Sequence, residues 1–290
     1  MNDLQRGLLC IVGATLCWSV SGVFVRWVPE VPSWTVNAWR CLGMALALLV
    51  WMVFHYRRGL GQLIANTQPQ AVLISGGCFA VGSTLYIVSL QLASVATVSC
   101  IGATAGLFSA LLARIWLGER SSPVFFVVMG MAILGVVWIA LSEAGASISG
   151  FAGALVALMV ALTFAGQSVS LRRFRAIGME PAIFVGGVSV FIILSLVPGL
   201  TPITRGEVLI LLFMGVVQLA IPLVLFMRGA RHVPAAPMVL ITMADSVLNP
   251  FWVWLIHGEL PPSGVYGGGT LILLAISINA FAQMRMSART

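Results

Sequence analysis

Long apolar runs separated by short polar or proline-containing connections make up most of this chain of 290 residues. A helix that crosses the hydrocarbon core of a bilayer needs about 20 mostly apolar residues. By this measure the pattern predicts ten membrane-spanning helices, near residues 7–28, 34–55, 69–91, 94–117, 123–142, 149–171, 180–200, 207–229, 234–257 and 262–284. The connections, such as the Pro261-Pro262 pair, carry residues that end helices. We therefore expect an all-α membrane protein.

Composition supports this interpretation. Hydrophobic residues are 60% of the chain and charged residues 8%, whereas soluble domains carry roughly a quarter charged residues. So few charges cannot form a polar surface, and lipid is the expected solvent for much of the protein. The first apolar run continues to about Val28, which favours a retained first helix over a cleaved signal peptide.

The basic residues define a predicted topology. All fifteen are arginines, so a P-loop lysine, a Schiff-base lysine and a lysine-rich nucleic-acid tail are excluded. If both termini face the cytoplasm, that side holds twelve arginines, namely Arg6, Arg57, Arg58, Arg114, Arg120, Arg172, Arg173, Arg175, Arg228, Arg231, Arg285 and Arg289. The other side holds Arg26 and Arg205, and Arg40 lies within the second span. The positive-inside rule thus predicts that both termini are cytoplasmic.

The chain resembles itself at a shift of 140 residues. The shift aligns Gly118-Glu119 with Gly258-Glu259 and Tyr86 with Phe226, and it superimposes the span boundaries. Each half, 1–145 and 146–290, then holds five spans, and an odd number means that the second half enters the membrane from the opposite side. Inverted repeats of this kind are typical of secondary transporters with a central site near the midplane. Chance matching between apolar helices is the alternative interpretation.

Several short motifs occur in order along the first half of the chain: Cys17-Trp18-Ser19, Ala38-Trp39-Arg40, Leu85-Tyr86, Ala93-Ser94-Val95-Ala96 and Trp116-Leu117-Gly118-Glu119. Together they resemble the EamA-type exporters of the drug/metabolite transporter superfamily. Within it the chain is most similar to the bacterial aromatic amino-acid exporters of the YddG type, with threonine/homoserine-type exporters as the neighbouring subgroup. This resemblance implies ten helices in the bacterial inner membrane around a central cavity that opens alternately to each side. It also implies export of amino acids or related metabolites. The chain departs from the repeat at Asn249-Pro250, which replaces Ser109-Ala110.

Asp245 is the first candidate for solute recognition. It lies eleven residues into the ninth predicted span, about 16 Å deep at 1.5 Å per residue. A carboxylate at such a depth costs about 2.5–3.5 kcal/mol on insertion scales and usually faces a cavity or a partner. It could anchor a substrate ammonium group, couple transport to protons, or form a hydrogen bond that only stabilises packing.

Arg40 is the second candidate. It is expected only about 9 Å below the outer surface, so its side chain could extend to the interface. The alternatives are recognition of a substrate carboxylate and an ion pair with Asp245.

Aromatic and amide side chains within spans complete the predicted site. Trp18 lies in the middle of a span and, with Phe79, Tyr86 and Phe164, could line a cavity for flat or apolar groups. Gln167 and Gln218 could hydrogen-bond a solute or a neighbouring helix. The predicted gating hinges are Gly82, Pro222, Pro237 and Pro250, because glycine and proline weaken helices; helix packing is the alternative role.

These features favour a secondary transporter that exports amino acids by alternating access. The alternative within transport is a multidrug or organic-cation exporter, which Asp245 and the aromatic residues also suit. HExxH, GxSxG and phosphate-binding motifs are absent, so we expect no enzyme. We expect no cofactor, no metal, because cysteines and histidines are scattered, and no nucleic-acid partner. The expected partners are a small-molecule substrate and the lipid bilayer, and a monomer suffices if the cavity is central. Proton exchange and uniport both remain open.

Overall fold

The computed structural model describes residues 3–118, 123–174, 180–196, 203–229, 232–233, 238 and 241–287. The helices of the first half are α1 (Asp3–Ser19), α2 (Ser21–Trp27), α3 (Ser33–Tyr56), the 3-10 turn η1 (Arg57–Gly59), α4 (Leu60–Asn66), α5 (Pro69–Ala71), the π-helical η2 (Val72–Gly76), α6 (Gly77–Leu92), α7 (Val95–Ala103), α8 (Ala105–Leu117) and α9 (Pro123–Ala146). The second half has α10 (Ile148–Arg173), α11 (Glu180–Leu196), α12 (Arg205–Met214), the π-helical η3 (Gly215–Ala220), α13 (Ile221–Gly229), α15 (Asp245–His257) and α16 (Ser263–Ser287).

The structure is all-helical over its described residues, as the sequence predicts. Within the described residues, eight helical segments are long and apolar enough to cross a membrane: Asp3–Trp27, Ser33–Tyr56, Pro69–Leu92, Val95–Trp116, Val124–Gly145, Ile148–Ser170, Arg205–Gly229 and Ser263–Ala282. The predicted seventh and ninth spans, 180–200 and 234–257, correspond to the shorter helices α11 and α15. Part of each predicted span falls on residues outside those described. A total of ten spans therefore stays a prediction.

Three of the membrane helices are interrupted along their length. The breaks fall at Val20 between α1 and α2, at Thr104 between α7 and α8, and at Ala244 just before α15. Hydroxyl groups bond back to the preceding turn near two of them: Ser19 Oγ donates to the Leu16 carbonyl (2.9 Å), and Thr104 Oγ1 donates to the Ile101 carbonyl (2.6 Å). Such bonds offer the backbone an alternative to the helical ladder.

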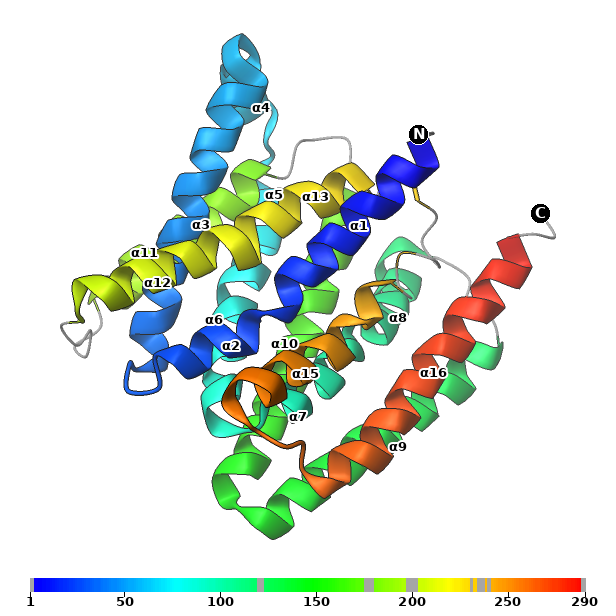
Figure 1. Ribbon diagram of the computed structural model, residues 1–290. Helices are drawn as coiled ribbons and strands as arrows, with labels where there is room; N and C mark the ends of the chain where they lie inside the picture. The colour runs from blue at the N-terminus through cyan, green and yellow to red at the C-terminus, as the bar shows by residue number, and fades with distance from the viewer. Residues whose placement is uncertain are drawn as a thin grey trace.

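The helices form a bundle in which α1 begins and α16 ends at the same end, called here the termini end (Figure 1). The connections α2–α3 and α15–α16 lie at the opposite end (Figure 1). The most extensive helix contacts join α9 with α16, α6 with α10, α3 with α11, α1 with α13, α8 with α10 and α7 with α15. Each of these pairs joins a helix of the first half to one of the second, so the two halves interlock.

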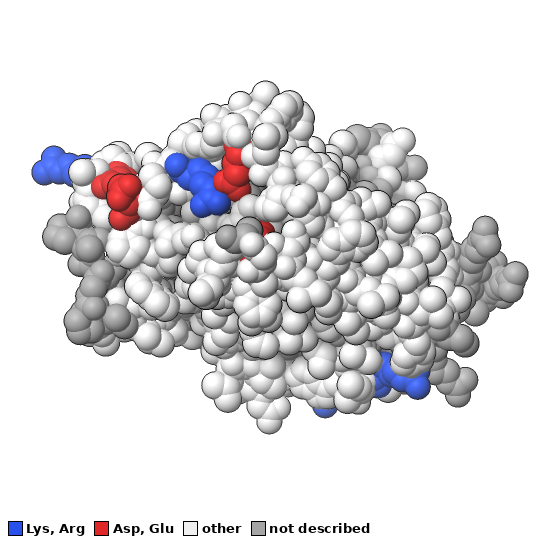
Figure 2. Space-filling view, turned by 90° about the horizontal axis from the view of Figure 1, so that it is seen from below, with Lys and Arg blue, Asp and Glu red and all other residues white. Residues whose placement is uncertain are grey.

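Much of the surface is apolar. Figure 2 shows charged side chains gathered in small patches beside a broad uncharged area. On α9, for example, Val127, Leu134 and Trp138 are each more than half exposed. Exposed apolar surface on this scale is expected of helices that face lipid.

Small residues set the closest helix contacts. A Cβ atom added to Gly135 of α9 would lie 2.6 Å from the Gly268 carbonyl of α16, and one added to Gly268 would lie 2.6 Å from the Gly135 carbonyl. This reciprocal approach resembles the small-residue contacts by which membrane helices associate. Gly130, one and a half turns earlier on α9, has open space at its Cβ position.

We predict that Gly135→Ala lowers the free energy of unfolding, because an added methyl group must push apart two backbones at a cost of about 1–3 kcal/mol. Gly130→Ala is the matched control on the same helix, and it should be neutral or stabilising by up to about 1 kcal/mol. Thermal unfolding of the purified proteins in detergent measures both. Equal midpoints for the two variants would contradict the close α9–α16 contact.

Candidate functional site

A buried hydrogen-bond network surrounds Arg40 of α3. Its Nη1 donates to Gln218 Oε1 of η3 (2.9 Å), and its Nη2 donates to Asn37 Oδ1 (2.9 Å) and to the Ser83 carbonyl of α6 (3.1 Å). Asn37 Nδ2 in turn donates to Thr84 Oγ1 (2.9 Å). These residues, Asn37, Arg40, Ser83, Thr84 and Gln218, are called the arginine cluster. It holds a guanidinium group that is 1% exposed.

The interpretation that the Arg40 side chain extends to the membrane interface is therefore wrong. The side chain turns into the bundle, where α3, α6 and η3 supply oxygen acceptors for it. The π-helical geometry of η3 lies next to α3, and Gly215 at its start brings the two backbones together: a Cβ there would lie 2.0 Å from the Arg40 carbonyl. Irregular helix turns of this kind often mark functional sites.

A second buried network surrounds Asn249 of α15. Its Oδ1 accepts from the Gly22 backbone N–H (3.0 Å), and its Nδ2 donates to Ser21 Oγ (2.9 Å) and Ser99 Oγ (3.1 Å). Ser21 Oγ and the Tyr86 hydroxyl are 2.6 Å apart. The set Ser21, Tyr86, Ser99 and Asn249 is called the asparagine cluster, and it joins α2, α6, α7 and α15 beside the helix breaks.

Tyr86 connects the two clusters. Its hydroxyl belongs to the asparagine cluster, and the Arg40 guanidinium lies over its ring, 5.8 Å from the centroid. Asp245 begins α15 one turn before Asn249, so the two side chains share a face of that helix. The Asp245 carboxylate also interacts electrostatically with Tyr86. The structure thus gathers Arg40, Tyr86, Gln218 and Asp245 from the predicted site residues.

Both charged residues retain unpaired polar atoms. Arg40 Nε and Asp245 Oδ1 are buried and have no hydrogen-bond partner. Arg40 and Asp245 do not form an ion pair with each other. The one ion pair among the described residues is Arg26–Glu259. Buried polar atoms without partners are rare in native proteins and call for an explanation such as a ligand.

The other predicted lining residues have different surroundings. Trp18 is half-buried, with its ring 5.5 Å from that of Phe226. Phe79 packs in an apolar core with Ala38 and Cys41, beneath the arginine cluster. Phe164 is 40% exposed on α10, and Gln167, three residues later, is buried. The roles of these residues in binding a solute stay predictions.

The predicted hinges are also in distinct settings. A Cβ atom at Gly82 would lie 2.7 Å from Thr163 Oγ1, so this glycine permits close contact between α6 and α10. Pro222 follows η3 and is buried, and Pro250 lies inside α15 directly after Asn249. Pro237 lies outside the described residues. Hinge motion at these positions stays a prediction.

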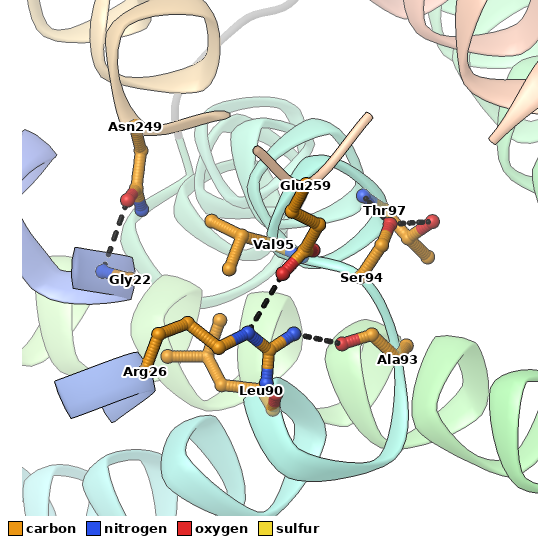
Figure 3. Close-up of polar contacts among 9 residues, drawn as sticks. All are labelled: Gly22, Arg26, Leu90, Ala93, Ser94, Val95, Thr97, Asn249 and Glu259. Atoms are coloured by element: carbon orange, nitrogen blue, oxygen red, sulfur yellow. Dashed lines mark hydrogen bonds and ion pairs between the residues drawn. The ribbon is translucent and has the colours of Figure 1, made fainter. Parts of the chain in front are cut away.

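The opposite end of the bundle is closed by an ion pair that sequence reasoning missed. Arg26 Nε of α2 bonds Glu259 Oε2 (2.7 Å), and Arg26 Nη1 donates to the Leu90 carbonyl (2.9 Å). Glu259 Oε1 accepts from the Val95 backbone N–H at the start of α7 (2.9 Å). Figure 3 shows how these groups, called the end clasp, tie α2, α6, α7 and the α15–α16 connection together. The hollow beneath, lined by Val95, Ala96, Pro250, Val253, Glu259 and Pro261, leaves no room for water.

Packing differs between the two parts of the fourth span. Every residue of α7 from Val95 to Ile101, at the opposite end, is buried. In α8, toward the termini end, the buried residues among the described side chains are Leu107 and Ala113. The described part of the bundle is therefore tight at the end clasp and looser beyond the break at Thr104.

Comparisons with known proteins show that the chain is similar to transporters. Residues 5–141 match the EamA-like transporter family. Over 279 residues the chain is 25% identical to the pseudopaline exporter CntI of Pseudomonas aeruginosa, in strains UCBPP-PA14 and PAO1, covering 95% of this chain and 96% of that protein. A solved crystal structure with 20% sequence identity superposes with a TM-score of 0.67 over 96% of this chain and 97% of its own. At this identity the superposition supports a shared fold alone.

We predict that Gln218→Leu destabilises the protein. The leucine leaves Arg40 Nη1 buried without its acceptor, and such an unpaired group costs about 1–3 kcal/mol, more when it is charged. Gln218→Glu is the matched control, because it keeps an acceptor at the same place and should unfold near the wild-type temperature. Thermal unfolding in detergent tests this, and a wild-type midpoint for Gln218→Leu would contradict the role assigned to Gln218.

Proposed function

We propose that this chain is a transporter of the EamA-like family, whose model matches residues 5–141, and that it exports zwitterionic small metabolites, amino acids among them, across the bacterial inner membrane. The observation that carries the proposal is the pair of buried, oppositely charged residues Arg40 and Asp245 near Tyr86, each with a polar atom left unpaired. An ammonium group of the solute would bind Asp245, and its carboxylate would bind Arg40.

Several features support the predicted inverted repeat. The helix breaks at Thr104 and Ala244 are 140 residues apart, as are the left-handed helix ends at Gly118 (φ 69°) and Gly258 (φ 70°). The contact pattern is also preserved when the halves are exchanged: the contact of α1 with α13 corresponds to that of α10 with α6. This arrangement supports the proposal of ten spans with a site at the repeat interface.

The bundle is closed at one end and more loosely packed at the other, and this asymmetry supports alternating access. The arginine distribution assigns the termini end to the cytoplasm, so the end clasp would close the periplasmic side. The site would then receive its solute from the cytoplasm through the more loosely packed side around α8. Export requires the clasp to break, because Arg26 and Glu259 join elements that must separate to release the solute.

An aromatic or apolar side chain of the solute would pack near Trp18, Phe226 and Tyr86. The same aromatic residues, with Asp245, suit an organic cation as the alternative cargo. The two cargo classes differ in their need for Arg40, because an organic cation has no carboxylate to bind it.

We expect Asp245→Asn to reduce exchange of zwitterions about tenfold or more, since a charge-assisted hydrogen bond is worth about 1.5–3 kcal/mol. Counterflow in proteoliposomes, run with a panel of amino acids, amines lacking a carboxylate and acids lacking an amine, measures this. Asp3→Asn is the matched control, with the same chemical change at the exposed start of α1. Repeating the assay at several pH values and with an imposed pH gradient tests proton coupling.

Two outcomes would count against the proposal. Wild-type exchange by Asp245→Asn at every pH would remove Asp245 from both recognition and coupling. Exchange of organic cations with no exchange of amino acids would favour the multidrug alternative.

We also expect Glu259→Gln to expose the hollow beneath the end clasp. A partly exposed ion pair is worth up to about 1 kcal/mol, which corresponds to a shift of about fivefold toward the open form. A cysteine introduced as Ala96→Cys, at a position 3% exposed in the closed form, should then react faster with a membrane-impermeant maleimide, in excess of the native cysteines. Glu30→Gln, an exposed acid at the same end, should leave the rate unchanged; equal rates for all three would argue against the clasp.

A further inference from the structure

A basic groove lies at the termini end between the start of α1 and the end of α13. It is lined by Arg6, Gly7, Cys10, Arg228 and His232, and it offers about 220 Å³ of space. One water needs roughly 10–15 Å³ on this measure, so the groove admits a group much larger than water. Arg6 and Arg228, both exposed, approach it from the two helices.

The floor of the groove is a close backbone contact. A Cβ atom at Gly7 would lie 2.9 Å from His232 Cβ, and one at Gly229 would lie 2.9 Å from the Gly7 carbonyl. The His232 N–H bonds back to the Gly229 carbonyl (3.0 Å), which fixes the turn after α13. The groove therefore rests on packed backbone and not on side chains alone.

The lining carries positive charge without compensation. Its described lining residues include two guanidinium groups and an imidazole but no carboxylate. Neither arginine forms an ion pair with another described residue. The Arg228 guanidinium lies over the Trp51 ring, 4.5 Å from its centroid, and Trp51 stacks on His55. The stacking holds Arg228 in place while leaving its N–H groups able to bind an anion.

The depth of the groove matches the headgroup layer of a bilayer. Arg6 lies one turn inside the span Asp3–Trp27, and Arg228 lies at the end of the span Arg205–Gly229. Leu4 and Leu9, on the same stretch of α1, are 46% and 58% exposed and would contact acyl chains. Basic pockets between membrane helices at this level suit phosphate headgroups.

We propose that this groove binds the phosphate headgroup of an anionic lipid, with Arg6 and Arg228 as its two cationic ligands. The phosphodiester oxygens accept hydrogen bonds from the two guanidinium groups, and the acyl chains lie against the exposed leucines of α1. Such a lipid would join α1 to α13, which pack together across the two halves of the protein.

The test is thermal unfolding of the purified full chain in neutral detergent with added lipid. Phosphatidylglycerol should raise the midpoint of the wild-type protein, and phosphatidylcholine should not. The shift should fall by at least half in Arg6→Gln and in Arg228→Gln and vanish in the double variant, while Arg6→Lys/Arg228→Lys should keep part of it. Arg173→Gln is the matched control, because Arg173 lies at the same end and also stacks on a tryptophan, Trp116.

Native mass spectrometry of the same samples counts retained lipid and does not depend on a change in stability. Loss of one bound phosphatidylglycerol in Arg6→Gln and Arg228→Gln, but not in Arg173→Gln, supports the proposal. Equal retention in all variants overturns it. Inorganic phosphate that reproduces the whole stabilisation also overturns it, because the ligand would then be a free anion. Neither measurement involves transport, so the result is independent of the proposed export function.

Discussion

The fold depends on one constraint: polar groups placed inside an apolar bundle must find partners within the protein. A buried guanidinium costs several kcal/mol to desolvate, and Arg40 recovers part of that cost from acceptors on three separate elements, α3, α6 and η3. Those acceptors fix the positions of the elements relative to one another. The asparagine cluster does the same for α2, α6, α7 and α15. The residues proposed to recognise charge therefore also determine how the helices are placed.

Sequence reasoning predicts the parts of this fold that lipid dictates. The predicted spans 34–55 and 123–142 agree within a few residues with α3 and α9, because the thickness of the bilayer determines where an apolar run must end. The helix breaks at Val20, Thr104 and Ala244 were not predicted. They leave hydropathy unchanged, and at two of them the backbone N–H bonds three residues back, from Thr104 to Ile101 and from Ala244 to Ile241. Glycine and proline are expected to mark such irregularities, yet all three breaks fall at other residues, Val20, Thr104 and Ala244.

The charged residues of the candidate site could be predicted from the sequence, but their positions and hydrogen-bond partners could not. Asp245 and Arg40 stand out because ionisable residues within spans are rare. Gln218 is 178 residues away from Arg40 in the chain, and Gly22 is 227 residues away from Asn249. Serine, threonine and asparagine are too common in membrane helices to be selected from sequence alone. Depth was misleading for Arg40 as well. Distance along a span says how deep a residue lies but not whether it faces lipid or protein, and here the protein supplies the stronger hydrogen-bond acceptors.

The two ends of the bundle use charge in different ways, and this difference connects the site to transport. At the opposite end, Arg26 and Glu259 neutralise each other and seal α7 against α15. At the site, Arg40 and Asp245 are held apart, each by its own helix, so neither can satisfy the other. A pair that could close on itself would leave no binding energy for a solute. In the proposed function, the separated charges gain their missing partners when a molecule with both charges lies between them. Under that proposal one ion pair serves as a closed gate and the other two charges stay open as a binding site.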